Sequence, residues 1–233
     1  MKKPVILLAI ILMALLLITS SCASQPSEPP PPDPSLSGSP GSSKASTHVI
    51  RRAENEADYP NHGITTTKVE PKPGESVSMV SGSWVRFTMD DLVEKSDTVL
   101  IGKVVDIFPS RQVDKPPWIV ITDVVIKVER YLYGQPQSAY IAVIVPGGRV
   151  GEMAMLVTDQ PEFNLGEEVA LFLLRPQLEI APPEGFAAAD YYMVSGLMQG
   201  KLGYIDGNMI TLEGNSVTFS EIEQKIASIH GDE

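Results

Sequence analysis

Hydrophobic and polar positions divide this chain into a polar, proline-rich stretch and a patterned region that follows it. In the patterned region, short runs of β-branched and apolar residues recur between glycine and proline breaks. The longest run, Trp118 to Tyr133, alternates apolar or β-branched residues with Asp123, Lys127 and Glu129. This alternation has the period of a strand that buries one face. The pattern therefore predicts a domain built mainly of strands.

Several segments share this β-prone composition and are bounded by turn residues. They are Thr98–Phe108, Trp118–Tyr133, Tyr140–Val145, Met153–Val157, Glu168–Leu174, Tyr191–Leu197, Lys201–Ile205 and Met209–Glu213. Longer proline-containing loops are expected at Pro109–Pro117 and Pro176–Ala189, and Asp206–Gly207 is typical of a tight turn. Gly102, inside the first segment, indicates a bend or a close backbone approach. Short strands with regularly spaced turns predict an all-β barrel or sandwich.

Short helices are predicted on either side of the strands. Thr88 and Asp91 have the spacing of a capping box, in which each residue bonds the backbone N–H of the other, and they predict a helix that ends near Ser96. Ser220 and Glu223 have the same spacing and predict a closing helix.

The first residues of the chain have the pattern of an export signal. Lys2 and Lys3 precede an apolar run from Val5 to Ile18, which is followed by small residues and by Cys22, the single cysteine of the chain. The run is shorter than the roughly 18 apolar residues of a membrane-spanning helix. The segment therefore predicts that the rest of the chain is exported.

The end of this signal, Ile18 to Cys22, resembles the lipobox of bacterial lipoproteins. In that family a signal peptidase cuts before the cysteine, and a lipid is attached to its sulfur. Ser20 and Ser21 are suitably small, whereas Thr19 stands where the usual pattern has leucine. The resemblance implies a membrane anchor at Cys22 on the extracytoplasmic face. An ordinary cleaved signal and an uncleaved short anchor are the alternatives, and both also export the chain.

Composition divides the exported chain into a tether and one domain. Residues 22–82 follow the signal peptide of residues 1–21, and their first half is almost entirely Ser, Pro, Gly and acidic residues. Such a composition is typical of a disordered spacer. The polar part from Ser46 to about Gly82 either shares that disorder or lies along the domain. Residues 83–233 are enough for one domain with a real core.

The exported chain is strongly acidic. Without Lys2 and Lys3, 16 basic residues face 29 acidic ones, a formal charge of −13. Phosphate backbones would be repelled, so nucleic acid is not expected as a partner. An anionic membrane would also repel the chain, so the lipid on Cys22 would have to hold it there. A single cysteine also excludes an intrachain disulfide.

Two stretches of the domain resemble netrin-like domains, such as the inhibitory domain of tissue inhibitors of metalloproteinases. They are Lys95–Val104, where a short helix leads into a strand, and Gly166–Leu173, a glycine followed by an apolar strand. The resemblance implies a closed β-barrel of the oligonucleotide/oligosaccharide-binding (OB) type with short flanking helices. Netrin-like domains are cross-linked by disulfides, and the metalloproteinase inhibitors among them bind zinc through an N-terminal cysteine. This domain has no cysteine, so zinc-dependent inhibition does not carry over.

No motif of the sequence indicates catalysis, a metal site or a cofactor. His48, His62 and His230 lack the spacing of zinc ligands. Ser83 and Ser195 stand near glycines but outside a Gly-x-Ser-x-Gly motif. Paired carboxylates are more economically explained as helix caps and solvated faces. The sequence therefore predicts a protein that is not an enzyme.

The aromatic and glycine-rich positions indicate where a partner would bind. In OB barrels the loop between the first two strands borders the ligand face, and Trp118 ends that loop here. Arg149 in a glycine-rich loop and Tyr191 beside the Pro176–Ala189 loop are further candidates. We expect a surface-tethered, non-enzymatic binding or accessory module with a protein or glycan partner. An exported hydrolase and a structural envelope protein are the alternatives.

The lipobox resemblance makes one direct prediction. Labelled fatty acid supplied to cells should enter the wild-type chain through the sulfur of Cys22. In the matched variant Cys22→Ala the label should be absent, as read by fluorography of the immunoprecipitated protein. Equal labelling of both chains, or none of the wild type, would rule out lipidation at this residue.

Overall fold

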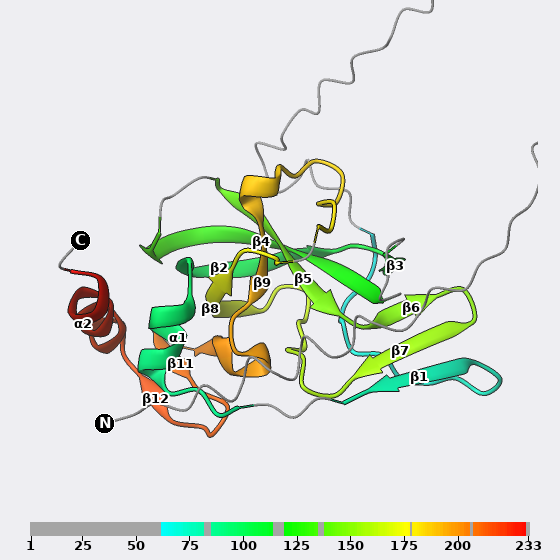
Figure 1. Cartoon of the computed structure of the whole chain (residues 1–233), viewed down its shortest axis with the longest axis horizontal. Coiled ribbons are helices and arrows are strands. Elements are labelled where there is room, and N and C mark those ends of the chain that lie inside the picture. The colour runs from blue at the N-terminus through cyan, green and yellow to red at the C-terminus, as the bar shows by residue number, and fades with distance from the viewer. Residues whose placement is uncertain are drawn as a thin grey trace, which may run out of the picture. The chain divides into compact units, whose positions relative to one another are not determined.

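The computed structural model describes residues 62–81, 85–113, 119–134, 138–177, 179–205 and 207–231. Its centre is a closed barrel of five strands (Figure 1). These strands are β2 (Thr98–Ile107), β4 (Val120–Tyr133), β5 (Tyr140–Pro146), β8 (Glu168–Leu174) and β9 (Tyr191–Val194).

The barrel closes through two contacts of the short strand β9. β2 pairs antiparallel with β4 on one side and with β8 on the other, and β4 pairs antiparallel with β5. β9 then lies parallel to β5 and antiparallel to β8, which completes the ring. A small closed barrel leaves none of its five strands with an open edge. The prediction of an OB-like β-barrel is therefore confirmed.

Alternate residues of these strands fill the barrel with aliphatic side chains. The largest buried cluster contains Leu100, Val104, Ile107, Val124, Ile126, Ile141, Val143, Val145, Phe163, Val169, Leu171, Leu173, Tyr192 and Val194. The first seven residues of β4 are buried on both faces. A strand can be buried on both faces only where a second layer covers its outer face, and this layer shapes the candidate site below.

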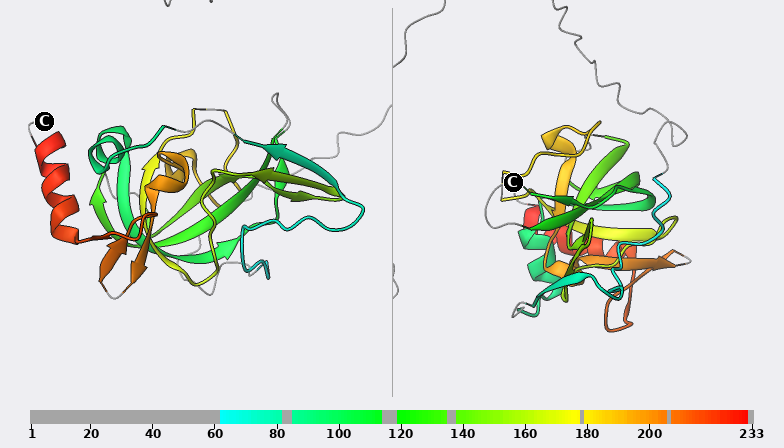
Figure 2. Two further views of the ribbon diagram at one scale, coloured as in Figure 1. Left: turned by 90° about the horizontal axis from the view of Figure 1, so that it is seen from below. Right: turned by 90° about the vertical axis from the view of Figure 1, so that its right-hand side faces the viewer.

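One outer layer consists of two helices and a sheet extension. The helices are α1 (Met89–Lys95) and α2 (Phe219–His230), and the extension consists of β10 (Lys201–Ile205), β11 (Asn208–Ile210) and β12 (Ser216–Val217). A cluster formed by Leu92, Val99, Phe172, Leu202, Ile222 and their neighbours fills the space between these elements and the barrel. Figure 2 shows α2 at one end of the domain and the strand tips of a second sheet at the other.

The helix caps agree with the sequence at one helix and differ at the other. Thr88 and Asp91 form the predicted capping box of α1. The cap of α2 is formed by Thr218 and Glu221, two residues before the predicted pair. Phe219, the first residue of α2, is partly buried against the outer cluster.

The second sheet includes part of the polar stretch for which the sequence left two alternatives, disorder or packing along the domain. It contains β1 (Ser76–Val80), β7 (Met153–Val157) and β6 (Gly148–Val150) in the order β1–β7–β6. β1 and residues 62–75 before it belong to the stretch expected as tether up to residue 82. Thr67 N–H donates to Phe163 O at 3.0 Å, so this stretch packs along the barrel. The five residues of β1 are all exposed and stand in a polar, proline-containing stretch, so the pairing was not predicted from the sequence.

Gly102 shows why the barrel needs a glycine. A Cβ atom added there would lie 2.5 Å from Lys127 O and 2.6 Å from Ile126 Cγ2. The register between β2 and β4 also shifts at this point. The close approach predicted for Gly102 is therefore present.

Gly102→Ala should destabilise the domain, because backbone must move to admit the methyl group. We expect a loss of about 1–3 kcal/mol in the free energy of unfolding, measured by urea denaturation. Gly203→Ala is the matched control, since it is also a strand glycine and a Cβ there meets nothing within 4 Å. The control should be neutral or slightly stabilising. An equal loss in both variants would contradict the role of the close approach.

Candidate functional site

Two long loops come together on the barrel. The first connects β2 to β4 and contains the short strand β3 (Arg111–Gln112), which pairs with the beginning of β4. The second connects β8 to β9 and ends in the 3-10 turn Ala188–Asp190. In OB barrels the loops between the first and second strands and between the fourth and fifth strands border the ligand face. These two loops occupy the same places in the strand order.

A buried carboxylate joins the two loops. Arg111 Nε donates to Asp123 Oδ2 at 2.7 Å, and the hydroxyl of Tyr191 donates to Asp123 Oδ1 at 2.5 Å. Arg111 Nη2 lies 3.0 Å from the Tyr191 hydroxyl oxygen and 2.6 Å from Ala181 O, to both of which it donates. We call Arg111, Asp123 and Tyr191 the loop lock. It connects the first loop, β4, the second loop and the start of β9.

The alternation of β4 puts Asp123 on the outer face of the barrel. Val124 belongs to the barrel interior, whereas Ile121, two residues before Asp123, belongs to an outer cluster with Ile144 and Tyr191. Apolar residues of the second loop cover this cluster, among them Ile180 and Phe186. Only 1 % of the Asp123 side chain is exposed. A carboxylate this well buried requires charged or hydrogen-bonding partners, and the loops supply them.

The electrostatics of the lock favour a fixed arrangement. Burial and the Asp123 carboxylate raise the pKa of Tyr191 far above its ordinary value of about 10. Burial disfavours the charge of Arg111, but the adjacent Asp123 outweighs it and raises the pKa of that guanidinium. A general acid or base works best with a pKa near the operating pH. The Tyr191 pKa is moved away from that range, so the lock is suited to holding the loops rather than to proton transfer.

The predicted contact residues lie in different environments in the structure. Tyr191 is 2 % exposed, so it acts inside the domain and not as a surface contact. Arg149 lies on β6, where its Nε is 2.6 Å from Glu75 Oε1 and its Nη2 donates to Glu70 O. It is therefore engaged with the segment that leads to β1. Trp118 and Cys22 lie outside the described residues.

Two residues of the lock were not among the candidates. Asp123 was named only as a polar position in the alternation of its strand, and Arg111 lies in the loop predicted at Pro109–Pro117. The alternation itself was a usable signal, because a single aspartate stands between Ile121 and Val125, among β-branched residues on both sides. What covers that face of the strand depends on the path of the second loop, which the alternation does not contain.

A histidine–aspartate pair is the nearest approach to a catalytic constellation. His62 Nδ1 lies 2.7 Å from Asp106 Oδ2, and the ring of His62 packs on Phe108. Within the described ranges, no serine, threonine or cysteine side chain is hydrogen-bonded to His62. Ser195, the buried nucleophile candidate, has no base beside it in the described structure. The pair lacks the nucleophile that a hydrolytic triad needs.

Two further kinds of feature concern metal ions and the membrane. The part of the chain that the structure describes contains no group of three His, Cys, Asp or Glu residues placed to hold a metal ion. Among the same residues, no helix has the length and apolar character needed to cross a membrane.

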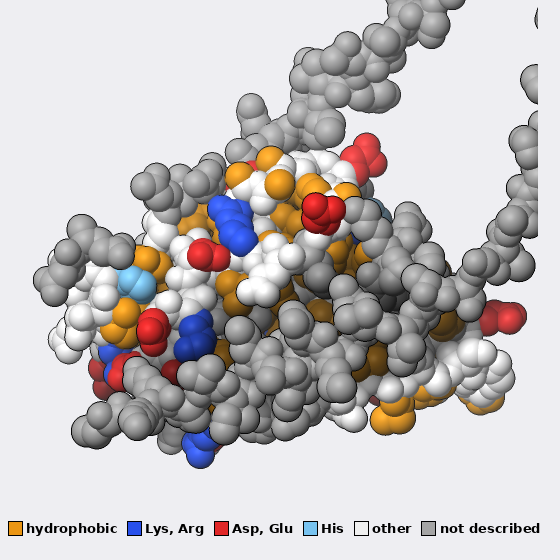
Figure 3. All heavy atoms as spheres, viewed as in Figure 1, with side chains coloured by type: hydrophobic (Ala, Val, Ile, Leu, Met, Phe, Trp, Pro, Cys, Tyr) orange, Lys and Arg blue, Asp and Glu red, His pale blue; other side chains and the backbone are white. Residues whose placement is uncertain are grey.

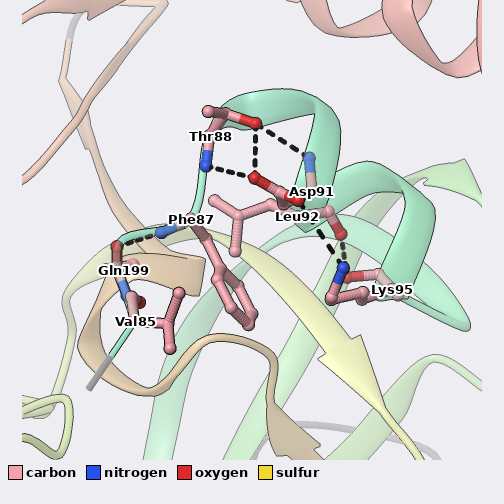
Figure 4. Close-up of polar contacts among 8 residues, drawn as sticks. Val85, Phe87, Thr88, Asp91, Leu92, Lys95 and Gln199 are labelled. Carbon is pink, nitrogen blue, oxygen red and sulfur yellow. Dashed lines mark hydrogen bonds and ion pairs between the residues drawn. The ribbon is translucent and has the colours of Figure 1, made fainter. Parts of the chain in front are cut away.

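A hollow lies beside the N-terminus of α1. Its volume is about 360 Å³, and its apolar wall includes Phe87, Leu92 and Leu202. Gln199 also lines this hollow, and Figure 4 shows it beside Phe87 and Val85. Gln199 Oε1 accepts from Phe87 N–H at 2.8 Å, and Nε2 donates to Val85 O at 3.0 Å. The amide thus fastens the strand-like segment before the helix, which is a structural role.

Comparison with known proteins does not extend this picture. No family model matches the sequence, and a search of curated proteins finds no match. The resemblance to netrin-like domains therefore stays a prediction. The function proposed below is derived from the geometry of the two loops and the loop lock.

The loop lock can be tested by removing one hydroxyl. Tyr191→Phe leaves Asp123 Oδ1 buried without its donor. We expect the free energy of unfolding to fall by about 1–3 kcal/mol, measured by urea denaturation at neutral pH. Hydrogen exchange of amides in the second loop should quicken as well, because Arg111 then holds Ala181 less firmly.

Tyr192→Phe is the matched control. Tyr192 is also fully buried, but its hydroxyl has no hydrogen-bond partner among the described residues. Removing that hydroxyl should be neutral or stabilising. If both variants lost the same stability, the hydrogen bond to Asp123 would not be what holds the loops.

Proposed function

We propose that this chain is an exported, lipid-anchored binding module without enzymatic activity, and that it holds a partner at the barrel end bordered by the two loops. The partner would be a protein or a glycan at the cell surface. The observation that carries this proposal is the loop lock, because it fixes the relative position of both loops before any partner arrives.

Fixed loops support binding more than they support catalysis. A surface that is ordered in advance loses less conformational entropy when a partner binds. The buried groups of the lock satisfy one another, and the pKa of Tyr191 is raised away from neutrality. OB-type barrels use this end for recognition, although that argument is an analogy of fold.

The N-terminal sequence supports the location. An apolar signal that ends at Cys22 would anchor the mature chain through lipid, and a proline-rich spacer would hold the domain away from the membrane. Such an arrangement suits a module that has to reach a partner at the cell surface. Its acidic charge argues against a direct electrostatic attraction to anionic lipid.

Photo-crosslinking in cells tests the proposed surface. A photoreactive amino acid would replace Gln112 on the first loop or Glu184 on the second, both of which are exposed. We expect both positions to capture the same partner, identified by mass spectrometry. The matched control is Glu129, an exposed position near the opposite end of β4, which should not capture it.

Other results would contradict the binding module in distinct ways. Capture of the partner from Glu129 with equal yield would place the contact elsewhere. Capture of wall polymer or of the chain itself alone would favour a structural envelope protein. Hydrolysis of generic ester, peptide or glycoside substrates by the purified chain, abolished by His62→Ala in a still folded protein, would favour the hydrolase, because His62–Asp106 is the one pair in the described structure that suits it.

A further inference from the structure

The strand β1 forms an outer edge of the second sheet. Figure 1 shows it along the side of β7 that faces away from β6, and no other strand of the described residues pairs with it. Its pairing with β7 is regular over the whole strand, from Ser76 opposite Met153 to Val80 opposite Val157. The edge is therefore straight and open.

The backbone polar groups of β1 divide between its two sides. Ser76 N–H donates to Glu152 O at 3.0 Å, and Val80 O accepts from Thr158 N–H at 3.2 Å. Successive residues of a strand point these groups to opposite sides, so Val77 and Met79 point theirs away from β7. The N–H and C=O groups of both residues are thus available to another extended backbone.

The side chains at this edge are apolar and exposed. Val77 is 43 % exposed and Met79 is 70 % exposed, and the alternation of the strand puts them on the same face. Met79 also lines a hollow of about 240 Å³ together with Pro146, Leu156 and Val157. Figure 3 shows hydrophobic side chains at the surface over this edge, at the lower right.

Natural proteins normally protect such an edge. Lysine, proline, bulges and very short strands are the usual means, and Ser76–Val80 has no charge, no proline and no bulge. The strands β12 and β6, at other sheet edges, have only two and three residues, whereas β1 has five. An edge left open at this length is typical of strands to which a partner segment adds.

We propose that β1 is a docking edge for an extended segment of a partner protein, which adds beside it as a further strand. The segment would hydrogen-bond to Val77 and Met79 and place alternating aliphatic side chains against them, one at the mouth of the hollow. This site shares no residue with the two loops and goes beyond the function proposed for them.

Charge defines the chemistry of that segment. Around β1, the basic residues Lys68, Lys72 and Arg149 stand against five acidic ones, Glu70, Glu75, Glu152, Asp159 and Glu162, a formal charge of −2 (3 basic minus 5 acidic). The surroundings of the edge thus share the negative sign of the chain, whose net charge is −13 without its signal lysines (16 basic and 29 acidic residues). An acidic segment would be repelled at a distance, whereas a neutral or basic one would not.

A second copy of the chain fits this edge less well. Antiparallel self-pairing about Ser78 would satisfy the same backbone groups, but a pair of five-residue strands falls far short of the roughly 1,200 Å² of a specific stable interface. Two copies would also carry the same strong negative charge. A single peptide segment does not need the buried area of a stable dimer, and it does not bring the negative charge of a second copy.

Amide hydrogen exchange of the full chain tests the docking edge. The probe is a short synthetic peptide in which valine and isoleucine alternate with threonine and lysine caps both ends. At saturating peptide, exchange at Val77 and Met79 should slow by about tenfold or more, since each amide gains a hydrogen bond. The Ser78 amide faces β7 and should change little. Unchanged exchange at Val77 and Met79 would overturn the proposal.

Edge variants give the second readout. Val77→Pro removes an outward donor at a position where an edge strand tolerates proline, and it should weaken peptide binding about tenfold. Met79→Lys leaves the backbone intact and should also weaken binding, whereas the control Ile205→Lys, another exposed apolar residue, should not. A concentration-dependent dimer that Val77→Pro abolishes would assign the edge to a second copy and overturn the proposal. Crosslinking from the loops should be unaffected by the edge variants, so failure at either site is recognised separately.

Discussion

The arrangement of this domain depends on one buried carboxylate. Asp123 lies on the outer face of β4, under a layer that excludes water, and an ionised carboxylate in such a place is costly unless it is paired. Its partners come from different parts of the chain, Arg111 from β3 and Tyr191 from β9. The same interaction therefore buries the charge and holds two long loops against the barrel.

Barrel closure and loop position support each other through β9. This strand is only four residues long, yet it pairs with both β5 and β8 and completes the ring. Its first residue, Tyr191, also belongs to the loop lock, and its second, Tyr192, belongs to the barrel interior. Adjacent residues of a strand point to opposite faces, so one short strand joins the interior of the barrel to its outer layer. The second sheet is different, because β1 ends it with an open edge.

Much of the fold could be predicted from the sequence, because strand periodicity and turn residues are local properties. The strands β2, β4, β5, β7, β8, β9, β10 and β11, the helix α1 with its Thr88 cap and the close approach at Gly102 follow from such patterns, whereas β3 and β6 lie in segments expected as loops. β1 was not predicted in this way, since its alternation covers only five residues, all of them exposed, within a polar stretch. The cap of α2 differed because Thr218–Glu221 and Ser220–Glu223 have the same capping-box spacing, so spacing alone does not choose between them.

The candidate site depends on tertiary contacts even more than the fold does. The sequence by itself determined the acidic composition, the β-rich domain and the two loops that border one end of the barrel, and the export signal that it predicts stays a prediction. Only the tertiary structure decided that Tyr191 is internal, that Arg149 binds Glu75, and that Arg111 and Asp123 meet. Local sequence sets the face to which a side chain points, whereas its burial and partners depend on segments distant along the chain. Asp123 and Tyr191, 68 residues apart, could be joined only by the folded barrel.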